Sequence, residues 1–205
     1  MFQNIKWLFF DVGSTIMDEQ LAYEHRMREI AGRANVSYEK VYEMAVAYYK
    51  ENKKGDLEAA KKLGVELPKW YQEGEVPYAD AVQCLGILYQ KYQIGIIANQ
   101  PPGTKERLAK KGILKYIDLV IASAEEGVAK PDGRIFEIAL ERSRCKPEQA
   151  VMIGDRIDND IVPAKLMGMR TIWIKQGFGQ YGNIRQEMEK PDFIVSNLSE
   201  LCNIL

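Results

Sequence analysis

Short apolar runs alternate along the chain with longer stretches that have helical periodicity. The first two apolar runs cover residues 5–10 and 93–98. Four further runs predict strands at residues 116–122, 150–153, 171–174 and 193–195. Helices are predicted near residues 78–91, 104–111, 132–144 and 159–167. Strands that alternate with helices predict an α/β fold, a doubly wound parallel sheet with helices on both faces.

The interval from residue 16 to about residue 80 breaks this alternation, because it contains no convincing strand. Val41, Ala45 and Tyr48 recur at helical spacing, and residues 21–34 and 57–63 are two further helix candidates. We interpret the interval as a small helical lobe inserted after the first strand, although a long crossover connection decorated with helices is the alternative. The predicted division is a core domain of residues 1–16 and 81–205 and a helical domain of residues 17–80.

The composition argues against nucleic-acid and membrane partners. The 205 residues carry 28 basic and 29 acidic side chains, for a formal net charge of -1. The overall charge of the protein therefore favours neither nucleic acid nor an acidic membrane as a partner. No apolar run approaches the roughly 18 residues of a membrane span, and the N-terminus lacks a signal-peptide pattern. Cys84, Cys145 and Cys202 are far apart and show no metal-type spacing. This usage favours reduced thiols in a cytoplasmic protein, and the oligomeric state is left open.

Polar residues follow the predicted strands at the points where the strands end. Asp11 follows the first strand, Asn99 follows the second, Lys130 lies in the loop after the third, and Asp155 follows the fourth. The carboxyl ends of parallel strands meet at one edge of a sheet, where α/β proteins bind their ligands. We therefore expect these four residues to converge on one site.

A second acidic residue, Asp160, lies at the expected start of the helix that follows Asp155. One carboxylate in the turn and one in the first helical turn can approach a cation from the same side. Clusters of carboxylate oxygens suit Mg²⁺, a hard ion that usually keeps several waters. The segment therefore predicts a magnesium site.

The order and spacing of these residues resemble those of the haloacid dehalogenase-like (HAD) hydrolase superfamily, most of whose members are phosphatases. The matching motifs lie at residues 11–15, 96–99, 129–131 and 154–160, so the resemblance covers nearly the whole chain. The resemblance implies a Rossmann-like core with an inserted helical cap, in agreement with the architecture predicted from patterning. It also implies Mg²⁺ as the cofactor and a phosphorylated small molecule as the substrate.

In that superfamily the first aspartate attacks the phosphoryl group, so the resemblance implies that Asp11 is the nucleophile and forms an aspartyl-phosphate. Lys130 would be a second catalytic residue, since its positive charge would face the phosphate. The implied phosphate-binding residues are Ala98, Asn99 and Lys130. The implied metal ligands are Asp11, the backbone carbonyl of Gly13, Asp155 and Asp160, the last in the inner or outer shell.

Two positions depart from the family pattern. Gly13 stands where a second aspartate commonly protonates the leaving oxygen, and such assistance is typically worth about 10²- to 10⁴-fold in rate. Ala98 stands where a Ser or Thr hydroxyl usually contacts the phosphate, a hydrogen bond worth about 1.5–3 kcal/mol. We therefore expect weakened activity, most of all with poor leaving groups. Whether Asp18 or Glu19 reaches the space beside Gly13 is left open.

The resulting hypothesis is a Mg²⁺-dependent phosphatase or phosphotransferase that acts on a small phosphorylated metabolite. One alternative is a catalytically impaired binding or regulatory protein that keeps the fold. A dehalogenase needs no Mg²⁺, so the Asp155 and Asp160 pair disfavours it, and a phosphonate hydrolase would need a cap lysine. We expect Lys54 to lie on a solvated helix face, with contact to the substrate as the alternative. We expect Trp70 to pack against the core, with a place in the lining of the cleft as the alternative. His25 is assigned no role.

Overall fold

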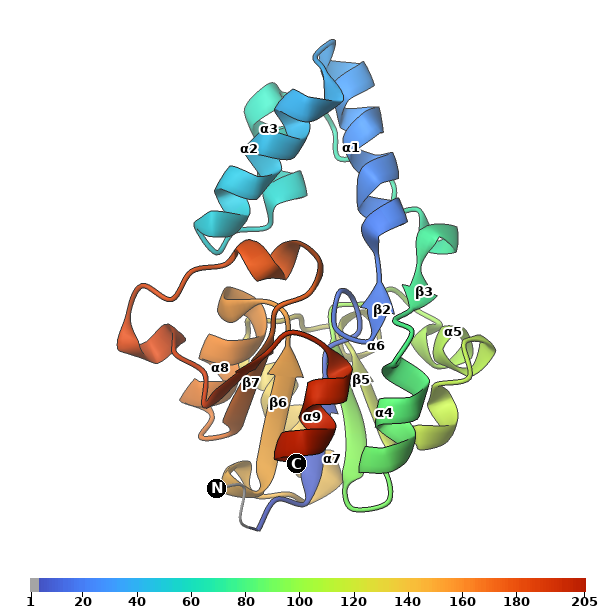
Figure 1. Cartoon of the computed structure of the whole chain (residues 1–205), viewed down its shortest axis with the longest axis vertical. Coiled ribbons are helices and arrows are strands. Elements are labelled where there is room, and N and C mark those ends of the chain that lie inside the picture. Colours follow the sequence, from blue (N-terminus) through green and yellow to red (C-terminus); the bar gives the residue numbers. More distant parts are fainter. Residues whose placement is uncertain (1–3) are drawn as a thin grey trace.

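A six-stranded sheet in which all neighbouring strands run parallel forms the centre of the structure (Figure 1). The computed structural model describes residues 4–205. The strand order is β5-β4-β1-β6-β7-β8. The strands are β1 (Trp7–Phe10), β4 (Gln93–Ala98), β5 (Leu119–Ala122), β6 (Ala150–Gly154), β7 (Arg170–Ile174) and β8 (Phe193–Val195). This arrangement confirms the predicted α/β class.

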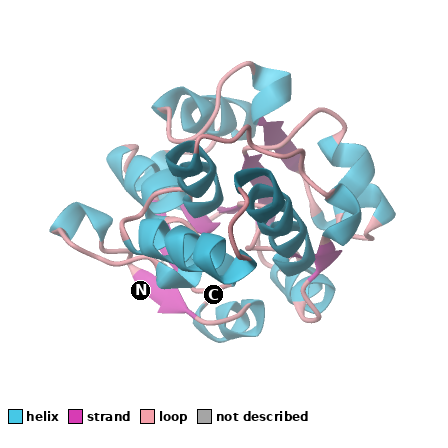
Figure 2. Ribbon diagram, turned by 90° about the horizontal axis from the view of Figure 1, so that it is seen from above, coloured by secondary structure: helices cyan, strands magenta, loops and turns pink. Residues whose placement is uncertain are grey.

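The side chains of β1 alternate between two cores, because successive residues of a strand point to opposite faces of the sheet. Leu8 and Phe10 belong to one core, whereas Trp7 and Phe9 belong to the other. The first face is covered by α4 (Ala81–Leu88), α5 (Thr104–Lys110) and α9 (Leu198–Ile204), and the second by α7 (Gly133–Ser143) and α8 (Val162–Leu166). Helices therefore lie on both sides of the strands, as Figure 2 shows from above.

Three helices are inserted between β1 and α4 and lie at the top of Figure 1. They are α1 (Gln20–Ala34), α2 (Tyr38–Lys50) and α3 (Gly55–Leu63). The helices bury residues such as Met27, Val41 and Ala59 in a core of their own, so the predicted helical insertion is confirmed. The exact division at residues 17 and 80 stays a prediction.

Two short strands connect the sheet to the helical insertion. β2 (Met17–Asp18) leads out of the core and β3 (Val76–Pro77) leads back, and the two pair in antiparallel fashion. The sequence prediction of no strand in this interval was therefore wrong. A strand of two residues is too short to show the alternation of apolar and polar positions from which strands are predicted.

Two of the predicted strands have the bounds found in the structure, and other predicted elements begin at different residues. The strands at 93–98 and 193–195 are found as predicted. The helix predicted at 159–167 begins as a π-helix, Ile157–Ile161, and continues as α8. The strand predicted at 116–122 starts later, because Leu114–Tyr116 forms a 3₁₀ turn. The short helices α6 (Ser123–Glu126) and α9 were not predicted.

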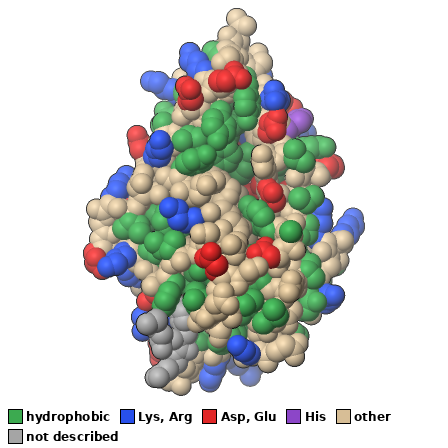
Figure 3. Space-filling view, in the orientation of Figure 1, with side chains coloured by type: hydrophobic (Ala, Val, Ile, Leu, Met, Phe, Trp, Pro, Cys, Tyr) green, Lys and Arg blue, Asp and Glu red, His purple; other side chains and the backbone are tan. Residues whose placement is uncertain are grey.

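Acidic and basic side chains are interspersed on the face that Figure 3 shows, so neither sign of charge dominates this face. This distribution fits the formal net charge of -1. Within residues 4–205, no helix combines the length and the hydropathy needed to cross a bilayer.

Gly95 of β4 provides a test of packing between neighbouring strands. A Cβ added there would lie 2.6 Å from the Phe9 ring, so Gly95→Ala should lower the free energy of unfolding by about 1–3 kcal/mol through overpacking. Gly32 of α1 is the matched control, because nothing lies within 4 Å of its added Cβ. Gly32→Ala should instead raise stability by about 0.5–1 kcal/mol. Urea denaturation of both variants measures these changes, and equal effects would contradict the packing argument.

Candidate active site

A buried lysine joins two aspartates at the carboxyl edge of the sheet. Asp11 follows β1, Lys130 lies in the loop between α6 and α7, and Asp160 lies in the π-helix after β6. The Lys130 Nζ donates hydrogen bonds to Asp11 Oδ1 and to Asp160 Oδ1, both at 2.6 Å. Only 1% of the Lys130 side chain is exposed. Segments more than a hundred residues apart along the chain therefore meet at one point, as their positions after the strands predict.

The charge of Lys130 is stabilised by its two partners. Burial alone would lower the pKa of Lys130, but the carboxylates of Asp11 and Asp160 outweigh this effect and raise the pKa above its usual value. Burial raises the pKa of Asp11, and the ammonium of Lys130 opposes this shift. The site therefore holds a fixed positive charge against a carboxylate that follows the central strand.

Asp155 completes a cluster of three carboxylates. One oxygen from each of Asp11, Asp155 and Asp160 lies within 4.8 Å of the others. Burial, followed by the charges of Asp160 and Asp11, raises the pKa of Asp155 well above its usual value. Buried carboxylates at this spacing repel one another unless a cation joins them, so the donor set fits a hard divalent ion such as Mg²⁺.

The contacts of Asp160 separate its role from that of Asp155. The Asp160 Oδ1 accepts a hydrogen bond from Lys130, and its Oδ2 accepts one from the backbone N–H of Arg156 at 3.0 Å. Both oxygens of Asp160 are thus engaged, whereas Asp11 has a second oxygen that does not bond to Lys130. Of the two positions predicted for Asp160, these contacts favour the outer shell.

Asn99 positions the loop that carries Lys130. Its Nδ2 donates to the backbone oxygen of Lys130 at 2.8 Å, and its Oδ1 accepts from the backbone N–H of Lys130 at 2.7 Å. Ala98 is the last residue of β4 and is fully buried in the core. The lining of the nearby cavity includes Asn99 but not Ala98, so Ala98 does not border the space in front of Asp11.

A cavity of about 400 Å³ lies over this cluster and is lined from both the sheet and the helical insertion. Asp11 and Asp155 contribute from the sheet edge, and Arg26, Lys54 and Trp70 contribute from the insertion and its return. The insertion therefore forms one wall of the space in front of Asp11.

Arg26 is the fixed cation of that wall. Its Nη1 donates to Asp56 Oδ2 at 2.8 Å, and its guanidinium lies 4.4 Å from the centroid of the Trp70 ring. Its Nε is buried and has no hydrogen-bond partner among residues 4–205. A buried N–H group of this kind has an unused capacity to donate to a polar ligand.

The family relationship follows from a comparison with known proteins. The family model of haloacid dehalogenase-like hydrolases matches residues 5–168, which include the aspartate cluster, Lys130 and the helical insertion. The chain belongs to the haloacid dehalogenase-like hydrolases. The resemblance inferred from the motifs is therefore confirmed.

Relatives of this HAD hydrolase include phosphatases from several organisms. Glyceraldehyde 3-phosphate phosphatase of Pyrococcus furiosus is 28% identical over an alignment that covers 99% of this chain and 94% of the relative. Phosphoserine phosphatase of Thermus thermophilus is 29% identical over 87% of this chain and 63% of its own length. The crystal structure of a HAD phosphatase from Thermococcus onnurineus has a TM-score of 0.66 at 25% identity and covers 98% of this chain and 97% of its own.

The space beside Gly13 in this HAD hydrolase is filled by Glu19. A Cβ added at Gly13 would lie 2.4 Å from Glu19 Oε1 and 2.7 Å from Oε2. The Ser14 Oγ donates to Glu19 Oε2 at 3.1 Å. Burial raises the pKa of Glu19 to about 8, and the negative charges of Glu75 and Asp11 add to the shift. Of the two acidic residues left open by the sequence, Glu19 lines the cavity together with Asp11, whereas Asp18 does not.

For two residues the structure favours the alternative that the sequence left open over the preferred interpretation. Lys54 and Trp70 both line the cavity. The Trp70 Nε1 donates to Glu75 Oε1 at 2.5 Å, so its ring is held at the cavity wall. Both residues flank α3 in loops, where no periodicity indicates which way a side chain points.

Proposed function

We propose that the protein is a Mg²⁺-dependent phosphatase that hydrolyses small phosphorylated metabolites through an aspartyl-phosphate on Asp11. The contact of the Lys130 ammonium with Asp11 and Asp160 at 2.6 Å, beside the third carboxylate of Asp155, carries this proposal. The ammonium attracts the phosphoryl group toward a carboxylate that is fixed at the end of the central strand. Attack at phosphorus then needs little rearrangement of the protein.

Each residue of the site has a role in the proposed reaction. Asp11 attacks phosphorus with one carboxylate oxygen, and Lys130 binds a phosphate oxygen. Asn99 holds the Lys130 loop and lines the cavity on the phosphate-binding side, whereas the buried Ala98 offers no group to the phosphate. The residues that would hold Mg²⁺ are Asp11, Asp155 and the backbone carbonyl of Gly13, with Asp160 in the outer shell. When bound, Mg²⁺ would neutralise the phosphate oxygens that otherwise repel the nucleophile.

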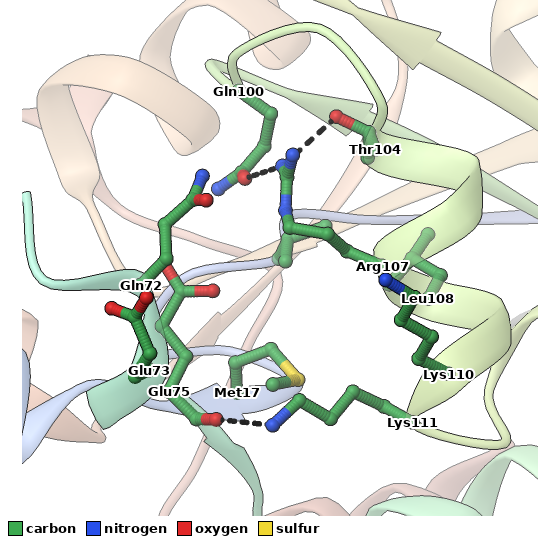
Figure 4. Close-up of a pocket in the computed structure, with 11 residues that line it drawn as sticks. Met17, Gln72, Glu73, Glu75, Gln100, Thr104, Arg107, Leu108, Lys110 and Lys111 are labelled. Carbon is green, nitrogen blue, oxygen red and sulfur yellow. Dashed lines mark hydrogen bonds between the residues drawn. The ribbon is translucent and has the colours of Figure 1, made fainter.

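The cavity supports a small polar substrate. Beside the 400 Å³ cavity lies a second one of about 250 Å³, and the two share Gln72, Glu75 and Gln100. Figure 4 shows Arg107 and Lys111 of the second cavity bonded within the protein, to Gln100 and to the Glu75 backbone oxygen. Neither of these two side chains is therefore placed to bind the phosphate, in contrast to Lys130, which contacts Asp11. The names of the relatives, a glyceraldehyde 3-phosphate phosphatase and a phosphoserine phosphatase, support a phosphorylated metabolite of a few carbons.

A catalytically impaired binding protein is the second candidate, because Gly13 and Ala98 lack the side chains that the family commonly uses. Such a protein would bind Mg²⁺ and phosphate mimics without turnover. A phosphotransferase would pass the phosphoryl group from Asp11 to an alcohol instead of water. A phosphonate hydrolase would require a Schiff base on a lysine such as Lys54, which borohydride trapping with substrate detects.

Phosphate release from a panel of sugar, amino-acid and aryl phosphates tests the proposal. Turnover should require Mg²⁺ and should stop when EDTA is added. Asp155→Asn should weaken Mg²⁺ binding, measured by calorimetry, by more than the roughly 10- to 100-fold that loss of an outer-shell partner costs. Asp158→Asn is the matched control, because Asp158 pairs with Arg156 outside the cluster, and it should change the affinity far less. Turnover that persists in EDTA would contradict the metal assignment.

A further inference from the structure

Glu19 is placed by the two-stranded connection between the sheet and the helical insertion. It directly follows β2, in which Asp18 pairs with Val76 of β3. Only 8% of Glu19 is exposed. Its backbone oxygen accepts a hydrogen bond from Tyr23 at 2.9 Å, which begins α1. The position of the Glu19 backbone is therefore fixed on both sides, by a strand pair and by a helix.

The turn before Glu19 also holds its carboxyl group. Ser14 has a φ of 53°, a left-handed conformation that residues with a Cβ rarely adopt. Its Oγ donates to Glu19 Oε2 at 3.1 Å. Strained backbone that persists because its surroundings fix it is found most often at functional sites. One oxygen of Glu19 is thus anchored, and this hydrogen bond leaves the other oxygen available.

A purely structural role for the Glu19 side chain is not supported by its contacts. Glu19 stands at the N-cap of α1, but its side chain makes no capping hydrogen bond. Among residues 4–205, no lysine or arginine forms an ion pair with it. A buried carboxyl group without a cation is costly to maintain. The position of Glu19 is distinguished by its carboxyl oxygens, which occupy the space where a Cβ at position 13 would lie.

We propose that Glu19 serves as the general acid and base of the reaction, in the space that a side chain at position 13 would otherwise fill. This role presupposes the proposed function and deepens it. Position 13 lies two residues beyond the nucleophile, and an added Cβ there would collide with both Glu19 oxygens, at 2.4 and 2.7 Å. Gly13 and Glu19 therefore form a matched pair, because the glycine provides the space and the glutamate provides the carboxyl group.

Each step balances with a single proton on Glu19. In the first step an Asp11 oxygen forms a bond to phosphorus, the bond from phosphorus to the leaving oxygen breaks, and the Glu19 carboxyl proton moves to that oxygen. The products are an alcohol, the aspartyl-phosphate and the Glu19 carboxylate. In the second step Glu19 takes a proton from water while the water oxygen attacks phosphorus. The bond from phosphorus to Asp11 breaks, and inorganic phosphate leaves.

Rates with leaving groups of different basicity test this role. Glu19→Gln should lower kcat for alkyl phosphates by about 10²- to 10⁴-fold. It should lower the first step far less for 4-nitrophenyl phosphate, whose leaving group needs no proton. With that substrate a burst of one nitrophenol per enzyme should precede slow turnover, because water also loses its base. Glu43→Gln, an exposed carboxyl of α2, is the control and should behave like the wild type.

Moving the carboxyl group from position 19 to position 13 gives an independent test of the proposed acid and base. Gly13→Asp alone should lose activity, because its side chain would collide with Glu19. Gly13→Asp combined with Glu19→Ala should hydrolyse alkyl phosphates faster than Glu19→Ala does. A Glu19→Gln effect that is absent, or equal for alkyl and aryl phosphates, would overturn the role of Glu19 while leaving the proposed function intact. A wild-type protein that turns over no phosphate would overturn both.

Discussion

Asp11→Asn should lower kcat/KM for every phosphate substrate by at least about 10⁴-fold, the scale on which enzymes respond to loss of a nucleophile. The amide keeps the size of the carboxylate but cannot form the acyl-phosphate bond. Folding should survive, because Lys130 keeps its contact with Asp160 at 2.6 Å. The measurement is phosphate release together with transfer of ³²P from substrate to protein. The wild type should carry a label that is stable in acid and released by alkali, and the variant should carry none.

The control for this experiment is Asp132→Asn. Asp132 caps α7 by accepting a hydrogen bond from the Arg134 N–H at 2.9 Å, and asparagine caps helices about as well as aspartate. The control therefore removes one negative charge without touching the cluster. It should keep both the rate and the label. A labelled Asp11→Asn protein, or one with unchanged turnover, would show that the nucleophile is another residue.

The sheet and the aspartate cluster could be predicted because both follow from strand positions. A buried parallel strand appears in the sequence as a continuous apolar run, and the residue after it lies at the edge where ligands bind. Asp11, Lys130 and Asp155 were placed on this basis, and they meet at the carboxyl edge of the sheet. Each of these positions depends on local sequence and on a general rule of α/β topology.

The position of Glu19 could not be predicted in the same way. It depends on the left-handed turn at Ser14 and on the pairing of two strands of two residues each, Met17–Asp18 with Val76–Pro77. Neither feature has a periodicity, and the second joins segments about sixty residues apart along the chain. The sequence therefore indicated a missing acid at Gly13, and only the tertiary structure brought a candidate replacement beside it.

The connection between sheet and insertion also joins the cavity wall that the insertion forms to the position of Glu19. Glu19 follows β2 and Glu75 precedes β3, and both line the 400 Å³ cavity. Glu75 accepts a hydrogen bond from Trp70, whose ring stacks with Arg26 of the insertion. Arg26, on the wall that the insertion forms, is therefore connected through Trp70 and Glu75 to the strand pair that positions Glu19.

Lys130→Met should impair both stability and activity, because Lys130 is the only cation that contacts Asp11 and Asp160 among residues 4–205. Methionine keeps the length of the side chain but leaves the buried carboxylate of Asp160 and the partly buried one of Asp11 without their partner. Removing one member of a buried ion pair costs about 3–5 kcal/mol. Loss of the charge that faces the phosphate should also lower kcat by about 10²- to 10³-fold.

The expected loss of stability should depend on Mg²⁺, since the cation would neutralise the same carboxylates. Urea denaturation of Lys130→Met should give the full loss in EDTA and a smaller one in millimolar Mg²⁺. The variant lacks the competing ammonium, so it should bind Mg²⁺ more tightly than the wild type and gain more stability from it. Lys91→Met, at an exposed position before β4, should change neither quantity. A Lys130→Met loss below about 1 kcal/mol in EDTA, the scale of a surface ion pair, would mean that the ammonium does not hold the aspartates together. Equal losses with and without Mg²⁺ would instead mean that Lys130 does not oppose Mg²⁺ binding at this cluster.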